Sequence, residues 1–219
     1  MRMVGVVLSR VDKGSHAFTT AVAIKEGGKW KQVRPHLANG HPLSAGYLGM
    51  GTHELNDGWK PGRIVVFDEM APADPNAVFP ENRIIKPRVT IGEKLTRSQM
   101  RAAVKGVTHP TIVALFPNLQ QRLDKVAYLC GGEEHLRSMG FVRCKEVWFT
   151  SGGDAHVCID DTQLVCKVRC RWVAQKLREG ILTTTRATPR PLLRFAALKD
   201  LDSDHYDPPR YHVALTGMR

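Results

Sequence analysis

Segments with the two-residue alternation of β-strands occupy both ends of the chain. Near its start, residues 3–8 and 17–24 are expected to pair as a hairpin, and residues 64–67 are expected to form a central strand. From residue 141 on the alternation returns, and it is strongest over residues 163–173. This pattern predicts a mainly β protein of the α+β class and argues against a doubly wound parallel sheet.

Helical periodicity is confined to the middle of the chain. Residues 97–105 and 118–130 place apolar side chains at helical spacing, and we expect one helix over each. A chain of 219 residues allows one large domain or two small ones. The expected organisation is a first β-barrel over residues 1–90, a helical connecting segment over residues 91–140, and a second β-barrel over residues 141–219. The two β-rich ends could be two copies of one barrel type.

The charge balance is the strongest compositional feature of the chain. Lys and Arg number 32 against 21 Asp and Glu, which gives a net charge of +11 at neutral pH. Such a surplus attracts polyanions over long distances, so nucleic acid is the first partner to expect and an acidic membrane surface the second. The alternative is a protein that is basic without binding a polyanion.

Hydropathy and cysteine content bear on the compartment. No stretch approaches the roughly 18–20 apolar residues of a membrane-spanning helix, and the first 11 residues lack the apolar core of a signal peptide. Five cysteines, an odd number, fit reduced thiols better than a disulfide framework. These features predict a cytoplasmic protein that does not engage a membrane.

Three short motifs in the first half of the chain resemble a known family. They are Trp30 with the Arg-Pro pair that ends at Pro35, the strand over residues 62–67, and Pro-Glu-Asn over residues 80–82. In this order they resemble the first half of the dual OB-containing domain family, and residues 138–143 resemble the small turn into its second barrel. The resemblance implies two OB-like β-barrels over most of the chain, with nucleic acid as the ligand. It brings no catalytic residues with it.

Two tryptophans of the first half lie among cations. OB-type barrels bind single strands with Lys and Arg on phosphates and with aromatic faces on which bases stack, each stack being worth about 1–3 kcal/mol. Trp59 falls in the polar segment 35–62, which is expected to be a long loop. Each tryptophan could instead be a core or rim residue, and Arg34 could face either a phosphate or a carboxylate such as Glu81. The predicted contacts of the first barrel are Trp30, Lys31, Arg34, Trp59, Lys60 and Arg63.

A second candidate surface follows from the alternation over residues 163–173. A strand with this pattern is apolar on one face and carries cations on the other, as a groove that tracks phosphates requires. Two further cations alternate in the same way on the preceding strand, expected over residues 141–149. An ordinary solvated strand face would look similar. The predicted contacts of the second barrel are Arg143, Lys145, Lys167, Arg169 and Arg171.

Metal binding is the less favoured explanation of a cluster of Cys and His. Cys166 and Cys170, if both lie on a strand, are roughly 13 Å apart at about 3.3 Å per residue, which is too far for one zinc ion. His156 and Cys158 lack a second pair of ligands, and the Asp-rich segment 200–207 lacks the glycine and glutamate of a calcium loop. We therefore expect core cysteines, no metal and no cofactor.

Catalysis is the second class of function to weigh. His156 and Cys158 could form a nucleophilic pair, but no third residue is assigned to orient the base. The sequence contains no P-loop, dinucleotide-binding fingerprint, zinc-protease motif or nucleophile elbow. The favoured hypothesis is a non-catalytic protein that binds nucleic acid, in particular single strands. The alternatives are an enzyme or accessory subunit acting on nucleic acid, and a basic module that docks an acidic protein partner.

Overall fold

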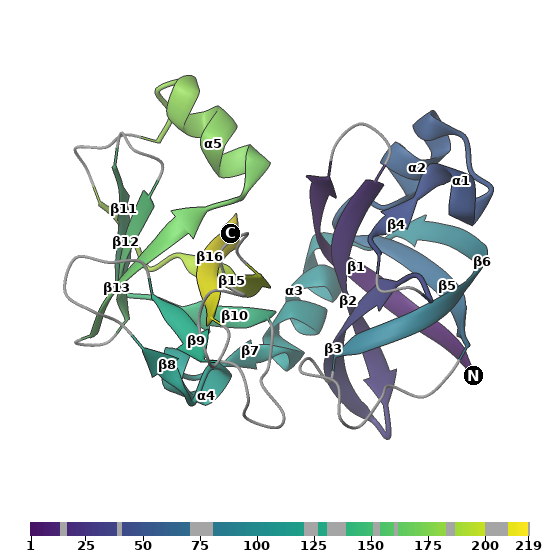
Figure 1. Ribbon diagram of the computed structural model, residues 1–219, viewed down its shortest axis with the longest axis horizontal. Helices are drawn as coiled ribbons and strands as arrows, with labels where there is room; N and C mark the ends of the chain where they lie inside the picture. Colours follow the sequence, from purple (N-terminus) through teal and green to yellow (C-terminus); the bar gives the residue numbers. More distant parts are fainter. Residues whose placement is uncertain are drawn as a thin grey trace. The chain divides into compact units, whose positions relative to one another are not determined.

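The chain forms two compact units, Met1–Val107 and Thr108–Arg219, which we describe one at a time. The fold is mainly β, with one closed five-stranded barrel and a second, curled sheet, and this confirms the predicted fold class. No helix in the described part of the chain is long and apolar enough to cross a membrane. The computed structural model describes residues 1–13, 17–38, 41–70, 81–120, 127–130, 139–150, 154–159, 162–182, 187–199 and 210–218 (Figure 1).

Five strands close the barrel of the first unit. Each strand pairs with two neighbours in the order β1-β2-β3-β6-β5 and back to β1, and only β3 and β6 run parallel among these pairs. This is the connectivity of an OB-like Greek-key barrel. The β1–β2 pair is the hairpin predicted from the sequence. The strands are β1 (Arg2–Lys13), β2 (Ala17–Glu26), β3 (Lys29–His36), β5 (Arg63–Glu69) and β6 (Asn82–Lys94).

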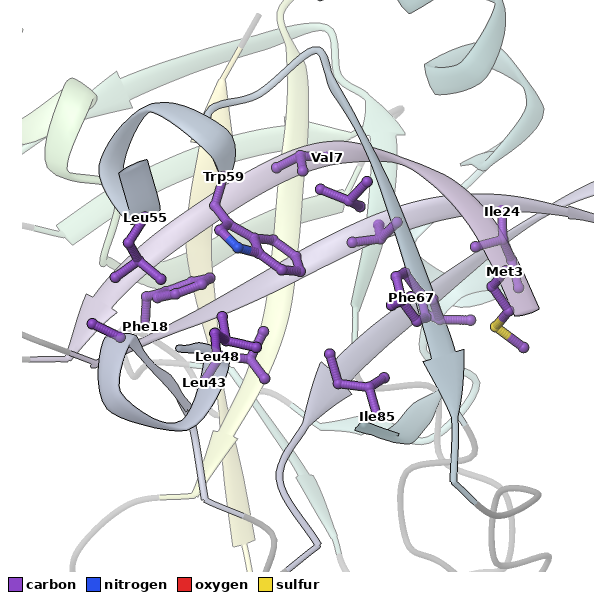
Figure 2. Packing of buried hydrophobic residues seen from close by; sticks show 14 residues of the cluster. Met3, Val7, Phe18, Ile24, Leu43, Leu48, Leu55, Trp59, Phe67 and Ile85 are labelled. Atoms are coloured by element: carbon purple, nitrogen blue, oxygen red, sulfur yellow. The ribbon is translucent and has the colours of Figure 1, made fainter. Parts of the chain in front are cut away.

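The segment between β3 and β5 supplies part of the barrel core. It contains β4 (Leu43–Ser44), α1 (Ala45–Leu48) and α2 (Thr52–Gly58), and Ser44 caps α1 by accepting a hydrogen bond from the Tyr47 amide. The prediction of a polar loop over residues 35–62 was therefore wrong, because a few spaced apolar residues were hidden among Gly, His and Asn. These apolar residues are Leu43, Leu48, Leu55 and Trp59. Figure 2 shows them packed with Phe18, Phe67 and Ile85.

Helix α3 (Arg97–Gly106) lies on the outer side of this barrel and confirms the helix predicted over residues 97–105. Thr96 caps it, and Gln99 completes the capping box. The helix contacts β1 and β3 and buries its apolar side, which carries Met100, Ala103 and Val104 (Figure 1). The expected connecting segment 91–140 is thus divided, since α3 belongs to the first unit and the residues from Thr108 on belong to the second.

The second unit is built around a curled sheet. Its main path runs in the order β14-β11-β12-β13-β16-β15-β10-β7, while β9 pairs with β16 and β8 pairs with β9. Its elements are β7 (Thr108–His109), α4 (Ile112–Leu115), β8 (Leu119–Gln120), β9 (Tyr128–Cys130), β10 (Met139–Arg143), β11 (Glu146–Phe149), β12 (Asp154–Ile159), β13 (Thr162–Val168), α5 (Arg171–Arg178), β14 (Thr188–Pro189), β15 (Leu192–Lys199) and β16 (Arg210–Met218).

The second unit repeats the connectivity of the first. Only Cys144 and Lys145 separate β10 from β11, so the two can be counted as halves of one bent strand. The order is then β11-β12-β13-β16-β15-β10, with β13 and β16 parallel and a helix between the third and fourth strands, as in the first unit. The second unit is therefore an opened copy of the same OB-like barrel.

Three element predictions in this unit need correction. The strand expected over residues 141–149 is broken between β10 and β11, and the strand expected over residues 163–173 ends at Val168, with α5 beginning at Arg171. The helix expected over residues 118–130 is strand at Leu119–Gln120 and Tyr128–Cys130, while residues 121–126 lie outside the described residues. In the first two cases a local alternation continued past the point where the strand ends. In the third, apolar residues at helical spacing lie in segments that pair as strands.

The packing of α3 on the barrel can be tested at Gly106. A Cβ atom added there would lie 2.2 Å from Cδ1 of Trp30, so Gly106→Ala should lower the free energy of unfolding by about 1–3 kcal/mol through overpacking. Gly46→Ala is the matched control, because nothing lies within 4 Å of its added Cβ. Urea unfolding of both variants measures the difference. A Gly106→Ala variant as stable as the wild type would contradict this packing.

Candidate nucleic-acid interface

The outer face of β3 in the first unit is occupied by residues of the same unit. The Trp30 ring packs on Gly106 of α3, and Lys25 Nζ lies 5.7 Å from the ring centroid. Both side-chain polar atoms of Gln32, two residues further along the strand, are buried without a hydrogen-bond partner. Trp30 is therefore partly exposed at most and is not displayed on an open surface.

Arg34 is partly buried and lies beside Glu81. Its backbone amide donates a hydrogen bond of 2.8 Å to the Glu81 carbonyl. Burial lowers the pKa of the Arg34 guanidinium from its ordinary value, and the charge of the Glu81 carboxylate opposes this shift. Of the two partners that the sequence left open, the carboxylate is the one that this geometry supports.

Trp59 is a core residue. Its side chain is 0% exposed, and its ring centroid lies 5.3 Å from that of Phe18 inside the barrel (Figure 2). A fully buried indole has no face on which a base can stack, so the prediction that Trp59 contacts a strand was wrong. The polar residues around it in the sequence disguised its place in the core.

The other cations predicted in the first barrel form local ion pairs. Lys31 forms an ion pair with Glu26. The hydrogen bond that Lys31 donates is the largest cause that lowers the pKa of the Glu26 carboxyl. Lys60 and Arg63 both bind Asp57, at 2.9 Å and 2.6 Å. Hydrogen bonds from Lys60 and Arg63 hold the pKa of Asp57 below its ordinary value. The structure therefore does not bring the six predicted residues of the first barrel into one open surface.

Four of the five cations predicted in the second barrel are exposed, but the five are spread over different elements. Arg143 ends β10, Lys145 follows it, Lys167 lies on β13, and Arg169 follows that strand. Arg171 is in the first turn of α5, and its side chain lies outside the described residues. Because β16 and β15 separate β13 from β10, Arg143 and Lys167 do not share one strand pair, as the sequence had suggested.

An aromatic pair occupies the outer face of β11 and β12. Trp148 and His156 are directly opposite each other in the antiparallel register. Their rings are stacked, with centroids 5.7 Å apart and an interplanar angle of 13°, and both side chains are partly exposed. The residues that flank them on each strand point inward and are buried: Val147, Phe149, Ala155 and Val157.

The register extends this pair into a face on three strands. His156 is opposite Val165 of β13, which is buried, and Lys167 on the same side of that strand is exposed. Gln163, also exposed, lies on the other side of Val165 along the strand. We call the outer face of β11, β12 and β13, with Trp148, His156 and Lys167, the aromatic face. It combines stacking surface with a cation, which is what an unpaired nucleotide requires.

Sequence reasoning missed Trp148 and His156 as a binding pair. The signal was present, because each alternates with buried residues on its own strand. What was absent was the register of β11 and β12, which is needed to see that the two rings meet.

The geometry separates the residues considered for a metal. His156 and Cys158 face outward from β12, whereas Cys166 is buried on the inward face of β13 and Cys170 precedes α5. Among the described residues, no three His, Cys, Asp or Glu side chains are grouped as metal ligands. The Asp-rich segment 200–207 lies outside the described residues.

Comparison with known proteins adds no family to this geometry. No protein-family model matches the chain, and no curated protein is significantly similar to it. The class that the fold itself defines is a mainly β protein with an OB-like barrel and a second unit of the same connectivity.

The different roles of the two tryptophans can be tested by stability. Trp59→Ala should lower the free energy of unfolding by about 3–5 kcal/mol, because it empties a large volume in the core. Trp148→Ala should cost less, because its side chain is partly exposed; the aromatic pair itself contributes about 0.5–1.5 kcal/mol beyond the area that it buries. Denaturant titrations followed by circular dichroism compare them. Equal losses would contradict the assignment of Trp59 to the core and Trp148 to the surface.

Proposed function

We propose that the protein binds single-stranded nucleic acid on the aromatic face of its second unit, without catalysing a reaction. The observation that carries the proposal is the partly exposed Trp148–His156 stack. An unpaired base can extend such a stack, and each base that stacks on an aromatic side chain contributes about 1–3 kcal/mol. Duplex DNA keeps its bases stacked on one another, so the proposal favours single strands.

The place of the face in the fold supports the same ligand. In OB folds the face of the second and third strands binds oligonucleotides. In the second unit these strands are β12 and β13, which carry His156 and Lys167. The net charge of +11 adds long-range attraction for phosphates.

The corresponding face of the first unit is a poorer binding surface. There Trp30 packs on α3, and Arg34 is partly buried beside Glu81. We therefore assign binding to the second unit and a supporting role to the first. The resemblance of the chain to the dual OB-containing domain family is part of the proposal.

An acidic protein partner is the competing hypothesis, since it would also use exposed cations. The aromatic pair favours nucleic acid, because ion pairing alone would not require stacked rings at the centre of the face. The cytoplasm is the compartment that we propose. The four cysteines whose side chains are described, Cys144, Cys158, Cys166 and Cys170, form no disulfide bond, which is consistent with it.

Binding can be measured by fluorescence anisotropy with a labelled oligonucleotide of about 12 nucleotides and mixed sequence. Wild-type protein should bind with an affinity that falls steeply as salt rises. Trp148→Ala should weaken binding by about tenfold or more, because it removes one stacking contact. Lys167→Gln should weaken binding and lower the salt slope by up to about 0.7.

Lys60→Gln is the control, since it removes the same charge from a residue that pairs with Asp57 in the other unit. It should leave the affinity close to that of the wild type. If the wild type does not bind DNA or RNA at low salt, the proposal is wrong and the acidic protein partner becomes the better hypothesis. If Trp148→Ala binds as well as the wild type, the aromatic face is not the site.

A further inference from the structure

We infer that Lys145 and Arg190 form a phosphate-binding corner beside the aromatic face. The corner would hold the backbone phosphate of a strand whose base stacks on Trp148. This inference rests on the proposed function, because it names the contact that the same ligand makes next to the stack. Lys145 was among the residues predicted from the sequence, whereas Arg190 was not.

The backbone brings the two cations together. The Arg190 amide donates a hydrogen bond of 2.6 Å to the Lys145 carbonyl. The Lys145 amide in turn donates one of 2.8 Å to the carbonyl of Cys158 on β12, and Cys144 donates one of 3.0 Å to Pro191. Backbone hydrogen bonds thus join the two residues between β10 and β11 both to β12 of the aromatic face and to the segment that carries Arg190. Both cationic side chains are exposed.

Arg190 adopts a backbone conformation that is costly for arginine. Its φ of 48° lies in the left-handed region, and it is the only described non-glycine residue with a positive φ. It also precedes Pro191, and the residue before a proline favours extended backbone. Glycine would adopt this φ at lower cost, so the local fold does not explain why an arginine is present. Strain of this kind concentrates at binding sites, and here an exposed guanidinium is what the strained residue contributes.

The corner and the stacking pair are within reach of one strand. Lys145 precedes Trp148 by three residues along the chain, which corresponds to about 10 Å in an extended strand. Glu146, which is partly exposed, lies between them, and Pro189 is its partner on β14. Arg143 is exposed at the end of β10 and adds a third cation. Along the chain it precedes Lys145, whereas Glu146 follows it. Guanidinium and ammonium groups together suit a phosphodiester, with the guanidinium able to donate two parallel hydrogen bonds.

The test compares two probes of equal length, the mixed-sequence oligonucleotide and an abasic oligomer that keeps the phosphodiesters but has no bases. Arg190→Gly should weaken the binding of both probes by about tenfold at low salt and lower the salt slope for both. Trp148→Ala should weaken the binding of the mixed-sequence probe alone. Arg190→Lys, which keeps the charge, should retain more affinity for both probes than Arg190→Gly.

Thermal melting separates binding from folding. Glycine favours a positive φ, so Arg190→Gly should melt at the same temperature as the wild type or higher. If this variant binds both probes as well as the wild type, or loses affinity only because it unfolds, the corner is wrong. If the wild type still binds in that case and Trp148→Ala still weakens binding, the proposed function holds without the corner. No wild-type binding to the mixed-sequence probe overturns both. If inorganic phosphate alone, at the salt concentration of the assay, displaces the abasic probe, the site recognises the free anion and not a strand.

Discussion

The contact between Trp30 and Gly106 determines which face of the first unit remains available. Gly106 has no side chain, and this lets α3 approach the outer side of β3 until the helix backbone meets the indole. The helix buries Met100, Ala103 and Val104 in this position. An amphipathic helix of ten residues is stable here because it covers apolar strand surface, and not because of its propensity alone. The consequence is that the same helix which stabilises the barrel occupies a face that OB folds commonly use for ligands.

The second unit repeats this connectivity with a different outcome. Its first strand is broken into β10 and β11, and the sheet is curled instead of closed. The outer face of β11 and β12 carries the Trp148–His156 stack, and the break carries Lys145 with the strained Arg190 beside it. One topology can thus support two roles, because the residues on its outer face are constrained far less than those in its core.

The sequence predicted the parts of this structure that local pattern determines. Alternation located β1, β2 and β5, and the cap at Thr96 located α3. Features that depend on distant pairing were not predictable. The strand pattern ran through the break at Cys144 and Lys145, where the chain turns to a new partner strand.

The candidate site was predicted only in part for the same reason. Trp59 appeared to lie on the surface because Asp57 and Lys60 surround it, yet it fills the barrel. The exposed cation Lys167 could be identified from alternation, because solvent exposure follows the strand period. Lys145 has the parity of the buried residues Val147 and Phe149, and it is exposed because it lies in the break before β11. The aromatic pair could not, since Trp148 and His156 come from two strands whose register the sequence does not state. Arg190 carries no sequence signal beyond its two flanking prolines.

The most direct test of this account follows the tryptophan indole N–H signals by NMR. The chain has four tryptophans, so a protein labelled with ¹⁵N-tryptophan gives few signals, and single substitutions assign them. Addition of a single-stranded oligonucleotide should shift the Trp148 signal strongly and leave those of Trp59 and Trp30 close to their starting positions. A shift confined to Trp30, or none at Trp148 under conditions where the oligonucleotide is bound, would contradict the assignment of binding to the second unit.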